Sequence, residues 1–167
     1  MTTEKHGYQP VEDGGNGHCG HRGRVLGPKR QVSAPMGHAG DDQRAIGRHA
    51  QPGDLVLLSG ALGTGKTCLA QGIAWGLEVK EYAHSPTFVL VHQYSGRLTM
   101  YHMDLYRIDD PREVVDLGID DYLDSNAMCV VEWAEKAARV FPSDYLGIQL
   151  EEISDDERRL TMMPHGV

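Results

Sequence analysis

A glycine-rich stretch of eight residues constrains the fold of this 167-residue chain more than any other feature. Residues 60–67 read Gly-Ala-Leu-Gly-Thr-Gly-Lys-Thr and match the pattern G-x-x-x-x-G-K-[ST] in full. The run before it, residues 55–58, is continuously apolar, as expected of a strand buried on both faces of a parallel sheet. The run after it, residues 67–77, has apolar side chains at helical spacing. The sequence therefore predicts a strand, a phosphate-binding loop and a helix, in that order.

The predicted loop has the chemistry of a polyphosphate site. Its glycines let the backbone curl so that successive N–H groups point inward, and the N-terminus of the following helix adds positive potential. We expect Lys66 to reach the β- and γ-phosphates and the hydroxyl of Thr67 to bind Mg²⁺. The alternative is a glycine-rich connection that binds nothing. It is disfavoured because the pattern and its strand and helix context are both present.

Two acidic residues compete for the metal or its water shell. Glu132 ends the short apolar run 128–131, so a buried parallel strand would deliver its side chain to the carboxyl edge of the sheet. Asp104 ends residues 98–103, where the pattern alternates and a central position is less evident. Either carboxylate could instead cap the helix that follows it. Both could also serve together, one on the metal and one on the attacking water.

The remaining pattern predicts a mixed α/β fold. Helices are expected at residues 41–50, 111–117 and 134–140, and further strands at residues 87–94, 98–104, 145–150 and 158–163. The last two strands are joined by the acidic turn 154–156, which indicates an antiparallel pair. The expected fold class is α/β, a P-loop NTPase-like, mostly parallel sheet flanked by helices, with an antiparallel C-terminal edge.

Length favours a single domain, and the composition is uneven along the chain. Residues 1–40 hold nine of the 20 glycines and show no apolar period, so we expect a disordered glycine-rich extension there. Residues 41–167 form the expected P-loop domain. The net charge of −8 argues against broad electrostatic capture of DNA or of an anionic membrane.

The sequence also predicts the location of the protein and the state of its cysteines. The chain has no apolar run of the roughly 18 residues that span a bilayer and no secretory pattern at its start, so the expected location is cytoplasmic. Cys19, Cys68 and Cys129 lie at wide, irregular spacing, which fits neither a disulfide framework nor a zinc site. We expect reduced thiols, two of them buried.

Four motifs in order resemble the TsaE family of bacterial tRNA threonylcarbamoyladenosine biosynthesis ATPases. They are residues 60–67, Ser-Pro-Thr-Phe at 85–88, Tyr-His-Met-Asp-Leu-Tyr-Arg at 101–107 and Val-Glu-Trp at 131–133. The resemblance covers about residues 42 to 163. It implies a small ATPase that uses ATP and Mg²⁺ and binds TsaB and TsaD. Its activity would support formation of threonylcarbamoyl-adenosine at position 37 of tRNA, with tRNA involved indirectly.

The resemblance also implies roles for particular residues. It gives catalytic roles to Lys66, Asp104 and Glu132, and metal binding to Thr67 and Glu132, with Asp104 the competing acid. Departures occur at Ala61, where the family usually has an acidic residue, and at Gln43, where it has a threonine. Arg158 matches the family's C-terminal basic strand as well as Arg159 does. The residues that it assigns to ATP are Gly60, Ala61, Leu62, Gly63, Thr64, Gly65, Lys66, Thr67, Thr87, Trp133 and Arg159.

Two other functions remain open from the residues. The same loop serves phosphoryl transfer, so a small-molecule or nucleotide kinase is one alternative, although the chain has little room for an acceptor pocket and a lid. A binding module that uses nucleotide only to order its surface is the other.

Overall fold

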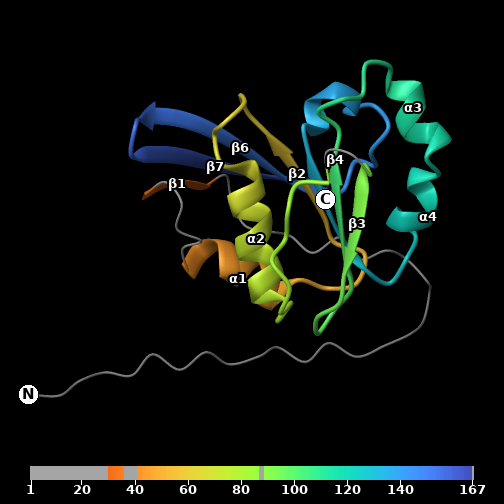
Figure 1. The fold of residues 1–167 in the computed structure, drawn as a ribbon, viewed down its shortest axis with the longest axis horizontal. Coiled ribbons are helices and arrows are strands. Elements are labelled where there is room, and N and C mark those ends of the chain that lie inside the picture. The colour runs from red at the N-terminus through yellow and green to blue at the C-terminus, as the bar shows by residue number, and fades with distance from the viewer. Residues whose placement is uncertain (1–29, 36–40, 87–88, 167) are drawn as a thin grey trace, which may run out of the picture.

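A seven-stranded sheet organises the computed structural model, which describes residues 30–35, 41–86 and 89–166 (Figure 1). The strands lie in the order β1-β7-β6-β2-β5-β4-β3. Their bounds are β1 Arg30–Pro35, β2 Leu55–Ser59, β3 Val91–Tyr94, β4 Met100–Asp104, β5 Met128–Glu132, β6 Tyr145–Ser154 and β7 Glu157–His165.

The four middle strands of the sheet, β6, β2, β5 and β4, are parallel. The predicted apolar runs explain their central position, since all five residues of β5 and the first four of β2 are buried. Parallel strands end at the same edge of a sheet, and in this chain Ser59, Asp104 and Glu132 end β2, β4 and β5. The two candidate acids therefore share an edge with the start of the glycine-rich loop.

Both sides of the parallel core are completed by antiparallel pairs. The β6–β7 hairpin and its acidic turn confirm the expected antiparallel C-terminal edge. At the other side, β3 pairs antiparallel with β4. The strand expected over residues 87–94 begins only at Val91, and Leu90 before it has a φ of 63°. The strand expected from residue 98 begins at Met100, after a bend.

Helices cover both faces of the sheet (Figure 1). On one face, α1 (Asp41–His49) and α2 (Lys66–Gly76) pack on side chains such as Val56, Val130 and Ile148. On the other face, α3 (Pro111–Asp116), α4 (Ile119–Leu123) and the 3₁₀ helix η1 (Ala134–Ala137) pack on Leu57 and Val131. Alternate residues of the central strands thus face two different cores, which is why these strands read as continuously apolar. The structure confirms the expected α/β class.

Two expectations need correction, and one helix was missed. Residues 30–35, expected within a disordered extension, form β1 and pair with β7, because an edge strand can be held by backbone hydrogen bonds without an apolar pattern. The helix expected over residues 134–140 is only the 3₁₀ turn η1, whose buried Ala134 and Ala137 lie three residues apart and align in a 3₁₀ turn. Helix α4 was not expected at all.

The structure also tests the expected burial of the cysteines and the expected lack of a membrane-spanning segment. Cys129 is buried and Cys68 is exposed, so a second buried cysteine is not found among the residues that the structure describes. Cys19 lies outside them, as do residues 1–29 and 36–40. None of the helices described combines the length and the apolar character that crossing a membrane requires.

Candidate functional site

The glycine-rich loop leaves β2 at the carboxyl edge of the sheet and enters α2. Gly60 has a φ of 143°, and a Cβ at this position would lie 2.4 Å from the carbonyl oxygen of Leu150 on β6. Gly65 directly precedes α2 with a φ of 97°, in the left-handed region that favours glycine. Gly60 is therefore required by the close approach of Leu150, and Gly65 by its left-handed backbone conformation.

Lys66 is buried inside the loop, with 4% of its surface exposed. Its Nζ donates hydrogen bonds to the carbonyl oxygens of Gly60 at 2.7 Å and Ala61 at 2.8 Å. Burial lowers the pKa of Lys66, and the negative charges of Glu132, Glu135 and Asp104 partly oppose that shift. The ammonium group is thus held by carbonyl oxygens that an anionic ligand could replace.

The side chain of Thr67 reaches the acid of the neighbouring strand. Its Oγ1 donates a hydrogen bond of 3.0 Å to Oε2 of Glu132. The other carboxylate oxygen, Oε1, lies 2.8 Å from Nε2 of His102. Glu132 is 2% exposed, and it does not cap η1, whose N-cap is Trp133. The alternative role of Glu132 as a helix cap is therefore wrong.

Asp104 is the second buried acid of this edge. It is paired in register with Glu132 across β4 and β5, and 3% of it is exposed. Its Oδ1 accepts a hydrogen bond of 2.9 Å from the backbone N–H of Tyr106, and its Oδ2 accepts one from the hydroxyl of Ser85. No helix begins after Asp104 in the described residues 105–110, so a helix-cap role is wrong here too. The bond to Tyr106 closes a side-chain turn instead.

Two aromatic rings stand beside the loop. The Nζ of Lys66 lies 3.7 Å from the ring centroid of Trp133, a cation–π contact. The Trp133 ring in turn lies 5.0 Å from that of Tyr106, centroid to centroid. Trp133 has a φ of 59°, an uncommon value for a residue with a side chain. The left-handed turn at Trp133 ends β5 and starts η1, leaving the indole half-buried against Lys66.

The hairpin of β6 and β7 borders the loop, because Leu150 of β6 lies against Gly60. Arg159 pairs in register with Glu151, one residue beyond Leu150, and is half-buried. Arg158 is buried and donates from Nη1 to the carbonyl oxygens of Ser154 at 2.5 Å and Glu157 at 3.1 Å, within its own hairpin. This difference favours Arg159 over Arg158 as the arginine available to a ligand.

The structure brings together most of the predicted site residues. Residues 60–67, Asp104, Glu132 and Trp133 form one cluster at the carboxyl edge of the sheet. Thr87, which the resemblance assigns to ATP, lies outside the described residues, although Ser85 of the same motif contacts Asp104.

Sequence reasoning missed three contacts within this cluster. They are His102 on Glu132, Ser85 on Asp104 and the carboxylate of Glu135 3.5 Å from the N–H of Gly60. One signal was readable for His102. It precedes Asp104 by two residues on a strand, and that spacing puts both side chains on one face.

The oxygen atoms of this cluster suit magnesium. Mg²⁺ prefers hydroxyl and carboxylate oxygens, keeps several waters and is often held by one or two protein ligands together with phosphate oxygens. Thr67 and Glu132 offer such a pair, with Asp104 beside them. No group of three or more histidines, cysteines and acids gathers as a metal site in the part of the chain that the structure describes. The donor set therefore fits a metal shared with a phosphate ligand.

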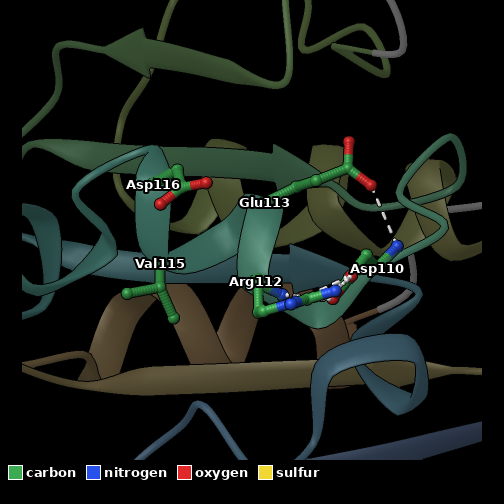
Figure 2. Close-up of a pocket in the computed structure, with 5 residues that line it drawn as sticks. All are labelled: Asp110, Arg112, Glu113, Val115 and Asp116. Carbon is green, nitrogen blue, oxygen red and sulfur yellow. Dashed lines mark hydrogen bonds and ion pairs between the residues drawn. The ribbon is translucent and has the colours of Figure 1, made fainter.

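A separate hollow of about 420 Å³ lies along α3 (Figure 2). It is lined by Asp110, Arg112, Glu113, Val115 and Asp116. Figure 2 shows that the polar groups at one end bond to each other, with Arg112 paired to Asp110 and Glu113 accepting from the backbone of Asp110. This capping box begins α3, and none of the lining residues belongs to the loop.

The fold and the loop together define the class of the protein. A parallel sheet covered by helices, with a glycine-rich loop between β2 and α2, is a P-loop NTPase-like α/β protein. The sequence matches the family described as threonylcarbamoyl adenosine biosynthesis protein TsaE over residues 39–160. The chain belongs to the TsaE family.

Curated relatives and a solved structure agree with this assignment. The tRNA threonylcarbamoyladenosine biosynthesis protein TsaE of Treponema pallidum is 40% identical over 117 residues, which are 70% of this chain and 87% of that protein. The Bacillus subtilis protein of the same name is 42% identical over 118 residues, 70% of this chain and 73% of that one. The crystal structure of Bacillus subtilis YdiB superposes with a TM-score of 0.66 and 32% identity, covering 83% of this chain and 88% of that chain.

Proposed function

We propose that this protein is an ATPase that binds Mg²⁺ and ATP in residues 60–67 and supports the threonylcarbamoyladenosine modification of tRNA at position 37. Membership of the TsaE family places the chain in threonylcarbamoyl adenosine biosynthesis. The observation that carries the ATPase proposal is the arrangement of Lys66 and Thr67. Lys66 is buried in the loop, and Thr67 is hydrogen bonded to Glu132 of the adjacent strand β5.

The loop residues account for phosphate binding. Backbone N–H groups at the start of α2 and the ammonium of Lys66 supply the positive charge that an overall acidic chain otherwise lacks. In the proposed complex Lys66 exchanges its bonds to the carbonyls of Gly60 and Ala61 for bonds to phosphate oxygens. Trp133, whose ring contacts Lys66, is a proposed further contact with the nucleotide, together with Arg159 and Thr87.

The hydroxyl of Thr67 and the two acids account for the metal and the water. Magnesium, when bound, neutralises negative charge on the phosphates. Thr67 and Glu132 are its proposed ligands, because their oxygens already meet at 3.0 Å. Asp104 is fixed by Ser85 and Tyr106 and is the proposed partner of the metal's water shell or of the attacking water. The described chain has an exposed face at this edge, where Leu62 is 72% and Tyr106 42% exposed.

This exposed edge is the proposed contact with TsaB and TsaD, since loss of the γ-phosphate would change the order of the loops next to it. Intrinsic hydrolysis is expected to be slow, because partners often complete such sites. We propose that the protein acts in the cytoplasm and that its effect on tRNA is indirect.

A reconstituted reaction tests the proposal. Lys66→Ala is expected to abolish both ATP hydrolysis and tRNA modification by TsaB and TsaD, because a buried cation that binds phosphate is lost. The matched control is Lys80→Ala, which removes an exposed lysine that is not part of the loop. Normal modification with the Lys66 variant would contradict the proposal. Full support of modification by ADP or a non-hydrolysable analogue would favour the binding module, and rapid phosphorylation of a nucleoside or sugar would favour the kinase.

A further inference from the structure

His102 is completely buried beneath the candidate metal site, with 0% of its surface exposed. It lies on β4 in register with Val130 of β5, two residues before the position paired with Glu132. From there its ring reaches diagonally across the two strands to Glu132, with Nε2 at 2.8 Å from Oε1. No sequence pattern assigned a role to this contact.

The two oxygens of Glu132 have different partners. Oε1 lies against the histidine within the sheet, and Oε2 accepts from the hydroxyl of Thr67 at 3.0 Å. A carboxylate oxygen only accepts hydrogen bonds, so Nε2 is the nitrogen of His102 that carries a proton and donates. Nδ1 is buried and has no hydrogen-bond partner among the described residues, so it adds no second anchor to the ring.

The position of the ring is set by packing instead. Tyr94 of β3 lies beside it, with ring centroids 6.4 Å apart, and the buried Met100, two residues earlier on β4, shares its face of the sheet. A ring packed in this way has few alternative orientations. The hydrogen bond to Glu132 therefore comes from a fixed donor.

We propose that His102 is a positioning residue for Glu132. By holding Oε1, it fixes the carboxylate so that Oε2 faces Thr67 and the magnesium ion bound there. Ligating carboxylates are commonly held by a second hydrogen-bond partner, and loss of such a partner typically costs 10–100-fold in metal affinity. This inference rests on the proposed function, because it concerns the metal that accompanies the nucleotide.

Replacement of His102 would have a different effect if the residue only filled the core than if it positions Glu132. If His102 only filled the core, its replacement would lower the stability of the protein. The Mg²⁺ concentration needed for tight nucleotide binding would stay unchanged. If it positions Glu132, binding of nucleotide without metal is retained, because the loop amides and Lys66 are intact. The concentration of Mg²⁺ needed for tight binding then rises.

Calorimetry with a non-hydrolysable ATP analogue separates these cases. The full-length wild type, His102→Leu and His102→Gln are titrated with the analogue in excess chelator and then at a series of Mg²⁺ concentrations. His102→Leu is expected to keep its metal-free affinity within about twofold and to need 10–100-fold more Mg²⁺ for half-maximal enhancement. His102→Gln retains an N–H that reaches about as far as Nε2 and is expected to restore most of the wild-type dependence.

The control is His165→Leu, which removes an exposed histidine of β7 that stacks on Tyr145 at the start of β6. It is expected to match the wild type. An unchanged Mg²⁺ dependence in His102→Leu overturns the inference and leaves the proposed function standing. Absence of any nucleotide binding by the wild type overturns both. Should the leucine variant not fold, His102→Gln and His102→Asn decide the matter, since equal Mg²⁺ dependence in these two also overturns the inference.

Discussion

Individual side chains at the carboxyl edge of the sheet are held by short polar contacts within an otherwise apolar interior. Glu132 and Asp104 are almost fully buried, yet each of their carboxylates accepts hydrogen bonds on both oxygens. Buried charges that lack such partners are costly. These hydrogen bonds therefore satisfy both buried carboxylates and fix their positions near Lys66, where the proposed chemistry needs them.

The cysteines give a prediction at the same scale. Burial raises the pKa of Cys129 to about 12, so its thiol stays protonated and unreactive at pH 8 to 10. Cys68 on α2 is exposed. Under native conditions a thiol-alkylating reagent is expected to modify Cys68 and to leave Cys129 unmodified until the protein is unfolded, as measured by peptide mass spectrometry. Modification of both at equal rates in the native protein would contradict the buried position of β5.

Helices α1 and α2 meet through their glycines. A Cβ at Gly47 would lie 2.1 Å from the carbonyl oxygen of Ile73, and one at Gly76 would lie 2.2 Å from that of Arg44. Both contacts are with helix backbone, which cannot move aside as a flexible side chain can. The first helix is therefore held close against the helix that begins at the loop.

This close approach predicts a large effect of a small substitution. Gly47→Ala raises helix propensity, but we expect it to lower the free energy of unfolding by about 3 kcal/mol because the helices must separate. Gly53→Ala is the matched control: its φ is 87° but nothing lies within 4 Å, so only backbone strain of about 1 kcal/mol is expected. Urea unfolding measures both. A Gly47 variant as stable as the wild type would show that α1 does not pack in this way.

The elements that could be predicted are those with strong local patterns. The apolar run of β2, the periodic α2 and the short apolar β5 were confirmed because burial on two faces leaves a readable signal. Strand β1 left none, since it is held by pairing with β7. The same holds within the site. The loop and both acids stood out by motif, but the contact between His102 and Glu132 depends on strand register, which sequence spacing does not supply.

At the scale of the whole molecule, the sheet has an apolar core on each face and gathers buried polar side chains at one edge. Two cores, one on each face, hold the four parallel strands in place. Charged groups gather where those strands end, and the loop, the hairpin of β6 and β7 and the turn after β4 all border that edge. In the proposed function, an acidic chain with a net charge of −8 binds a polyphosphate through local backbone amides and one lysine.

Calorimetric titration of the full chain with ATP and Mg²⁺ tests this account most directly. The wild type is expected to bind one nucleotide per chain, and Lys66→Ala, at matched folding by circular dichroism, is expected to lose that binding. Equal binding by the wild type and the Lys66 variant, or no binding by the wild type in the presence or absence of TsaB and TsaD, would contradict it.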